Sequence, residues 1–188
     1  MNDVGHSERQ TQNRVIALFR DELHYRFLGD WSDREGNSNI EEALLTAHLE
    51  RKGNAPEQIS RVLHKLRVES DTPNRNLYEN NRQVYGLLRY GVQVRTEAGQ
   101  LTETVHLIDW QHPEANDFAI AEEVTLRGNR ERRPDIVLYL NGIAIGVLEL
   151  KNSRRSIGEG IRQNLSNQQK EFNEWFFSTV HILFAGHD

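Results

Sequence analysis

The Asn141-Gly142 dipeptide constrains the fold of this chain more than any other feature of its sequence, because it joins two short apolar runs. Residues 132–152 read RRPDIVLYLNGIAIGVLELKN, and both runs are rich in Val, Ile, Leu and Tyr. Such runs favour strands, and Asn-Gly is the strongest short-range signal for the tight turn of a β-hairpin. The sequence therefore predicts a hairpin, which brings the outer ends of its two strands together.

The outer ends of the predicted hairpin carry charged side chains. Asp135 starts the first strand after a proline, and Glu149 and Lys151 end the second. Charge in so apolar a sheet costs free energy unless it is paired. Carboxylate oxygens suit Mg²⁺, and a lysine two residues after the glutamate lies on the same face of the strand. Such a set can assist hydrolysis of a phosphodiester, with the lysine orienting or helping to deprotonate the attacking water. A salt bridge on an edge strand is the alternative that this pattern leaves open.

The two carboxylates can share a metal only if they lie on one face of the sheet. A plain two-residue turn would place Asp135 and Glu149 on opposite faces, because side chains alternate along a strand. We therefore expect an extra residue, either in a three-residue loop with Gly142 left-handed or in a bulge at Gly146. The other face should then pack through Ile136, Leu138, Leu148 and Leu150.

The string RRPDIVLYLNGIAIGVLELKNS closely resembles the nuclease motif of the R (restriction) subunit of type I restriction enzymes, and PEANDFAIAEEVTLRG resembles the strand before that motif. The resemblance implies a PD-(D/E)xK nuclease domain at the start of a longer chain. It also implies that Asp135 and Glu149 bind the divalent metal, Mg²⁺, and that Lys151 is the catalytic lysine. Many members carry a glutamine and a tyrosine four residues apart on the next helix. Here Gln163 holds the glutamine position and Asn167 replaces the tyrosine.

The same resemblance implies an activity and partners. The expected activity is Mg²⁺-dependent endonucleolytic cleavage of double-stranded DNA, in a complex with methyltransferase (M) and specificity (S) subunits. ATP would serve only a DNA-translocating motor expected beyond residue 188, since this chain contains no P-loop motif. Two other interpretations stay open: a nuclease of the same fold in repair, transposition or RNA processing, and a degenerate domain that only contacts DNA or the motor.

The net charge of −5 is unevenly distributed along the chain. Residues 127–162 contain eight basic and four acidic residues, so this segment carries +4 and the remainder carries −9. Such a local excess of cations attracts phosphate, although a solvated loop rim explains each arginine equally well. The candidate DNA-contacting residues are Arg130, Arg132, Arg133, Arg154, Arg155 and Gln163.

We expect one α/β (α+β) domain over residues 1–188, with a mixed central sheet flanked by helices. Residues 1–90 should be mainly helical, with a first helix up to Gly29, a second from Ile40 to Lys52 capped by Asn39, a third opened by Pro56 and a fourth near 76–90. Residues 91–188 should form a sheet-rich catalytic core. Its other expected elements are a hairpin over 92–109, strands at 118–126 and 180–184, and a helix at about 157–172.

Two acids near the start of the second predicted helix are further candidates for the metal shell. The resemblance implies that the first core helix can offer a further carboxylate to the metal, and Glu41 or Glu42 is the candidate for it. Favourable interaction of acids with the helix dipole is the alternative explanation.

Composition narrows the chemistry and the compartment. The chain has no cysteine, and its eight histidines lack zinc-ligand spacing, so oxygen ligands remain. No run approaches the roughly 20 apolar residues of a membrane span, and the N-terminus lacks the apolar core of a signal peptide. We therefore expect a cytoplasmic protein with no membrane partner.

Overall fold

A five-stranded mixed sheet forms the centre of the protein, in the strand order β1-β4-β5-β6-β7. The computed structural model describes residues 8–95, 101–128, 130–151, 157–170 and 172–187. Four strands run in one direction, and β5 (Ile136–Leu140) runs against them. The four are β1 (Arg26–Asp30), β4 (Phe118–Glu122), β6 (Ile143–Lys151) and β7 (Ile182–His187). This is the mixed α/β class predicted from the sequence, and it is compatible with a PD-(D/E)xK-like nuclease core.

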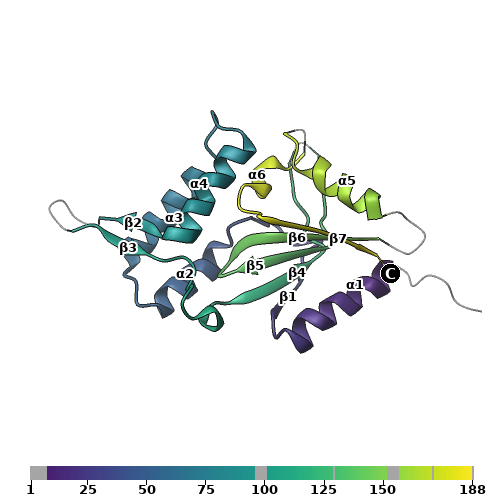
Figure 1. The fold of residues 1–188 in the computed structure, drawn as a ribbon, viewed down its shortest axis with the longest axis horizontal. Coiled ribbons are helices and arrows are strands. Elements are labelled where there is room, and N and C mark those ends of the chain that lie inside the picture. The colour runs from purple at the N-terminus through teal and green to yellow at the C-terminus, as the bar shows by residue number, and fades with distance from the viewer. Residues whose placement is uncertain (1–7, 96–100, 129, 152–156, 171, 188) are drawn as a thin grey trace, which may run out of the picture.

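Helices cover both faces of this sheet (Figure 1). On one face lies α1 (Glu8–Ala17), which continues into the π-helical turn η1 (Leu18–Glu22). On the other face lie α5 (Ile157–Asn167) and α6 (Glu174–Phe177). Ile16 of α1 packs in one apolar cluster with Ile136 and Leu138, whereas Phe176 of α6 packs in another with Val137 and Tyr139. Successive side chains of β5 therefore pack into two separate cores, one on each face of the sheet.

A second group of elements packs around the turn end of the hairpin (Figure 1). It consists of α2 (Glu42–Arg51), α3 (Pro56–Ser70), α4 (Leu77–Tyr90) and the small antiparallel sheet of β2 (Val92–Val94) and β3 (Glu103–Val105). The short helix η2 (Pro113–Ala115) precedes β4. Leu140 and Ile143, which flank the turn, belong to the apolar cluster of this group. The turn end of the hairpin is thus buried in an apolar core, and the charged residues lie at the opposite end.

The hairpin turn explains why Asn and Gly stand at its two positions. Asn141 and Gly142 both have positive φ, +53° and +87°, as a tight two-residue turn requires. The Asn141 side chain is completely buried and satisfied: its Oδ1 accepts from Asp117 N at 2.7 Å, and its Nδ2 donates to Leu107 O at 2.8 Å. Leu140 pairs directly with Ile143, so the predicted three-residue loop is wrong.

The extra residue that the hairpin needs is Ile145. The pairing shifts between Tyr139↔Ala144 and Leu138↔Gly146, which leaves Ile145 as a bulge just before Gly146. This is next to the second of the two predicted positions. Beyond the bulge Ile136 pairs with Leu148, and continuing the register by one residue sets Asp135 opposite Glu149. The predicted opposite face is confirmed, because its four residues pack in the cluster under α1: Ile136, Leu138, Leu148 and Leu150.

Several predicted elements are confirmed, but the first predicted helix ends at Glu22 and does not reach Gly29. α3 opens at Pro56, and α4 is capped by Asn76, whose Oδ1 accepts from Glu79 N at 2.9 Å. Residues 26–30 form β1 in the central sheet instead of continuing a helix to Gly29. Phe27 and Leu28 pack into the cores on opposite faces of the sheet, which a single helical stripe cannot do.

Other boundaries differ from the predictions for reasons of tertiary contact. Asn39 does not cap α2; its buried side chain donates to Trp175 O at 2.9 Å and Ser178 Oγ at 3.1 Å. The predicted strand 118–126 ends at Glu122, and Leu126 makes only an isolated bridge to Arg132. α5 ends at Asn167, and the strand predicted at 180–184 runs over 182–187. No helix of the described residues is long and apolar enough to cross a membrane.

Gly142 should be intolerant of any side chain. A Cβ there would lie 2.7 Å from Leu45 N and 2.8 Å from Glu41 O, at a φ that side-chain-bearing residues avoid. We expect Gly142→Ala to lower the free energy of unfolding by roughly 2–4 kcal/mol in urea titrations. Gly36→Ala is the control, because it has a similar φ of +72° and open space, and should cost only about 1–2 kcal/mol. Equal losses in the two variants would contradict the close approach of α2 to the turn.

Candidate active site

The predicted acids and lysine meet where β6 ends and β5 begins. Asp135 immediately precedes β5, and Glu149 and Lys151 lie two residues apart near the end of β6. The bulge at Ile145 sets the two acids opposite each other across the hairpin. The structure therefore brings together the three residues that the sequence singled out.

Asp135 is half-buried and held by the neighbouring strand. Its Oδ2 accepts a hydrogen bond from Leu150 N at 2.5 Å, and its carbonyl oxygen accepts from Gln12 Nε2 at 3.2 Å. Burial raises the pKa of Asp135 to about 6, and the bond from Leu150 N and the charge of Lys151 only partly oppose this rise. The carboxyl group is thus fixed in place but poorly solvated.

Glu149 is fully buried, with 0% of its surface exposed. Its Oε1 accepts from Asn167 Nδ2 at 3.4 Å, while its Oε2 lies 4.0 Å from Lys151 Nζ and has no hydrogen-bond partner among the described residues. Burial, and then the adjacent charge of Asp135, raises the pKa of Glu149 to about 8. A second cation beside this pair would stabilise both ionised forms.

Lys151 is 8% exposed and forms its closest ion pair with a residue that the sequence did not single out. Its Nζ lies 3.1 Å from Glu8 Oε1, at the first residue of α1. Glu8 also raises the pKa values of both Asp135 and Glu149 through its charge. Because an acid at a helix start is common, only the packing of α1 across the sheet identifies Glu8 as part of the site.

The donor set fits a hard divalent cation. No three acids or histidines among the described residues are grouped tightly enough to hold an ion by themselves. The pair of Asp135 and Glu149 nevertheless offers carboxylate oxygens, one of them buried without a partner. Mg²⁺ commonly takes one or two protein carboxylates and keeps several waters, so two such residues suffice.

The structure does not bring Glu41 or Glu42 to this pair. The Glu41 carboxylate accepts from Arg34 at 2.6 and 2.9 Å, and its backbone N–H donates to Gly142 O at 2.8 Å. Glu42 pairs with Arg67 of α3. Both acids therefore lie at the turn end of the hairpin, with the length of β5 between them and Asp135. The expectation of a third ligand from this helix fails because α1, not α2, reaches the outer end of the hairpin.

Three of the candidate DNA-contacting arginines lie in the connection between β4 and β5, whose far end is Asp135. The Arg132 guanidinium lies 4.0 Å from the centre of the Phe172 ring, and that of Arg130 lies 5.5 Å from it. Arg133 Nε pairs with Glu123 Oε2 at 2.8 Å. Arg154 and Arg155 lie outside the described residues. Gln163 is half-buried on α5, one helical turn before Asn167.

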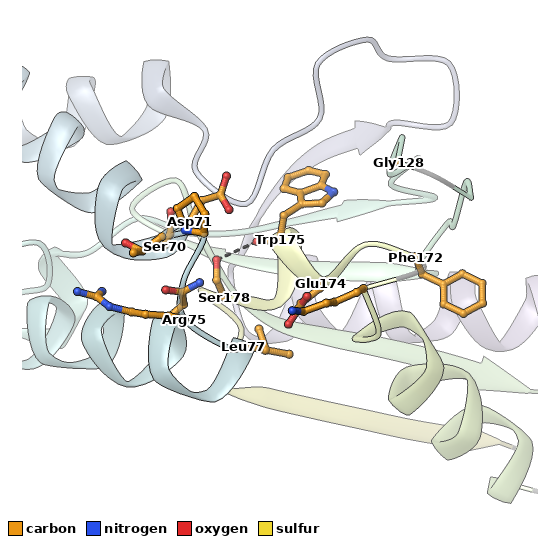
Figure 2. Close-up of a pocket in the computed structure, with 13 residues that line it drawn as sticks. Ser70, Asp71, Arg75, Leu77, Gly128, Phe172, Glu174, Trp175 and Ser178 are labelled. Carbon is orange, nitrogen blue, oxygen red and sulfur yellow. Dashed lines mark hydrogen bonds between the residues drawn. The ribbon is translucent and has the colours of Figure 1, made fainter.

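A cavity of about 370 Å³ lies beside this arginine-bearing connection, between the α3–α4 connection and α6 (Figure 2). Gly128, Phe172 and Trp175 line one side, and Asp71 and Arg75 line the other. Phe172 points away from Arg75 and Asp71 in Figure 2. The cavity lining contains Arg75 and Lys170 but also Asp71 and Glu174, so the cavity has no excess of cations. The cavity contains none of Asp135, Glu149 and Lys151, and we assign the site to the acid pair.

The fold defines an α/β protein that is compatible with a PD-(D/E)xK-like nuclease core, and sequence comparison identifies the family. Residues 5–188 match the family model described as the type I restriction enzyme R protein N terminus. The chain belongs to this family.

Named relatives agree with this assignment. The type I restriction enzyme HindI endonuclease subunit of Haemophilus influenzae is 36% identical over 164 residues, which cover 82% of this chain and 15% of the relative. The putative type I restriction enzyme MjaIXP endonuclease subunit of Methanocaldococcus jannaschii is 28% identical over 104 residues, which cover 52% of this chain and 10% of the relative. The chain thus spans only a small part of the length of these proteins.

The raised pKa values predict that the metal-free protein loses stability as pH rises. Glu149 ionises in the unfolded chain near its ordinary pKa of 4.5 but in the folded protein only near 8, so its destabilising effect develops between these values. We expect Glu149→Gln to remove most of this loss, on the order of a few kcal/mol, and to melt above the wild type at pH 9.

Thermal unfolding from pH 4 to pH 9, followed by circular dichroism in EDTA, measures this effect. Glu103→Gln serves as the control, because Glu103 is exposed on β3 and should leave the pH profile unchanged. If the melting temperatures of the wild type and Glu149→Gln changed with pH in the same way, the raised pKa of Glu149 would be contradicted.

Proposed function

We propose that this chain is the nuclease part of a type I restriction enzyme and cuts double-stranded DNA with Mg²⁺ held by Asp135 and Glu149. The observation that carries the proposal is the register of the hairpin, which sets the two acids opposite each other with Lys151 two residues further on. Family membership supports a restriction role. The HindI relative is named as an endonuclease subunit, which supports the same role.

Each residue of the site has a distinct part in the proposed reaction. Leu150 N fixes one oxygen of Asp135, and Asn167 contacts one oxygen of Glu149, so each acid keeps an oxygen for the ion. Mg²⁺, when bound there, would neutralise charge on the phosphate and favour ionisation of water. Lys151, held by Glu8, would orient or help to deprotonate the attacking water and stabilise the negative charge that develops on the phosphate.

The proposal also assigns the contacts with DNA and the partners that bring DNA to the site. Arg130, Arg132, Arg133 and Gln163, with Arg154 and Arg155, are the proposed contacts to the phosphate backbone. An ATP-driven motor in the same polypeptide as this domain, together with separate M and S subunits, would deliver the DNA. The complex would work in the cytoplasm. The intact set of Asp135, Glu149 and Lys151 weighs against a degenerate domain, because burying Glu149 beside a second acid is costly without a cation.

Calorimetric titration with Mn²⁺ or Mg²⁺ tests the metal site. Asp135→Asn keeps the size of the side chain and removes one ligand charge, so we expect at least about a tenfold loss of affinity. Asp109→Asn is the matched control, because Asp109 pairs with Lys52 at the end of α2, the helix that packs at the turn end of the hairpin, and should leave the affinity unchanged. Equal binding by the wild type and Asp135→Asn would remove the proposed site.

Cleavage and ATP hydrolysis by the assembled enzyme test the role of Lys151. Lys151→Met keeps the apolar stem and removes the charge, so we expect DNA cleavage to fall by about 10²-fold or more while ATP hydrolysis continues. Lys65→Met on α3 is the control, because Lys65 pairs with Glu69 of the same helix, away from the acid pair. If Lys151→Met lost both activities, or kept both, Lys151 would have a structural role or none in the reaction.

A further inference from the structure

Helix α5 packs against the ends of β6 and β7 through a glycine. A Cβ on Gly160 of this helix would lie 3.3 Å from Ala185 Cβ and 3.7 Å from both Glu149 O and Lys151 Cγ. The helix is also tied down, because Asn164 Nδ2 donates to Phe184 O at 2.8 Å. At its end Asn173 N donates to the carbonyl oxygen of Asn167 at 3.3 Å. The Asn167 backbone is therefore anchored beside the acid pair.

The Asn167 side chain is 0% exposed and points at one acid only. Its Nδ2 lies 3.4 Å from Glu149 Oε1, which makes it the one side-chain donor to Glu149 among the described residues. Two oxygens of this pair of side chains stay buried without a hydrogen-bond partner in the described structure: Glu149 Oε2 and Asn167 Oδ1. Buried oxygens without donors are uncommon in proteins, and a water or an ion is one of the groups that can satisfy them. Asn164 Oδ1 on the same helix is also buried without a partner, but only the Asn167 amide contacts an acid of the site.

The arrangement of donors decides which Glu149 oxygen is available. The amide engages Oε1, and Lys151 Nζ stays 4.0 Å from Oε2, so Oε2 is left for a further cation. A Mg²⁺ ion held by two carboxylates keeps several waters, which need acceptors for their own hydrogens. Asn167 Oδ1 is a buried acceptor on the side chain that already contacts Glu149.

We propose that Asn167 is a positioning residue of the metal site: its amide nitrogen orients Glu149, and its amide oxygen accepts a hydrogen bond from a water on the ion. This inference rests on the proposed function. It gives this chain an amide at the position where many members of the family carry tyrosine, so that one side chain supplies both a donor and an acceptor.

Calorimetric titration of Asn167→Leu with Mn²⁺ tests this role, because leucine fills the same space without either polar group. We expect the affinity to fall about 10- to 100-fold, the range found when residues that orient metal ligands are replaced. Asn164→Leu is the matched control: it removes a buried amide from the same helix that bonds to Phe184 O. Asn164→Leu should lower the melting temperature and leave the Mn²⁺ affinity unchanged.

A measurement on the unchanged chain covers the case in which Asn167→Leu does not fold. The side-chain ¹⁵NH₂ resonance of Asn167 should shift during titration with Mg²⁺, at the same concentrations that saturate the calorimetric signal, while that of Asn164 stays in place. If the wild type binds Mn²⁺, but Asn167→Leu binds equally well or the Asn167 resonance does not move, this inference is wrong and the proposed function stands. If the wild type binds no divalent ion, both are wrong.

Discussion

The extra residue Ile145 in β6 is the constraint on which the rest of the site depends. The two-residue turn fixes Leu140 opposite Ile143, and an unbroken ladder from that pair would place Asp135 and Glu149 on opposite faces of the sheet. One bulged residue reverses this phase for everything beyond it, so Asp135 falls opposite Glu149. The apolar residues on the other face then pack under α1. The buried turn holds the start of the register, because Asn141 is bonded on both sides and Gly142 lies against α2. The geometry of the acid pair at one end of the hairpin thus follows from packing at the other.

The electrostatic consequence of this register is a pair of acids held where neither ionises easily. Burial raises the pKa values of Asp135 to about 6 and of Glu149 to about 8. Only partial compensation comes from Lys151, which is shared with Glu8. Gln12 of α1 and Asn167 of α5 fix the two acids from opposite faces of the sheet. Burying the two acids side by side costs stability, because burial disfavours their ionised forms.

Sequence patterns predicted the parts of this structure that local chemistry determines. Asn141-Gly142 and Pro56 each favour one backbone conformation, and the turn and the start of α3 are confirmed. The parts that tertiary packing determines were missed. The sequence of Arg26–Asp30 suits a helix or a strand, and its pairing with β4 makes it a strand. Glu8 and Gln12 enter the site only because α1 crosses the end of the sheet, and Glu41 leaves it because α2 packs at the turn. The bulge was required by the proposed chemistry, but its place at Ile145 follows from the contacts of β6 with both neighbouring strands.

The location of a bound ion tests the central claim most directly. Crystals of the chain soaked in Mn²⁺ and measured near the manganese absorption edge would show each ion as an anomalous difference peak. Our account predicts a peak between the carboxylates of Asp135 and Glu149 that disappears in Asp135→Asn crystals treated in the same way. A peak at Glu41 and Glu42, or none at Asp135 and Glu149 in crystals at a pH above 8, would contradict it.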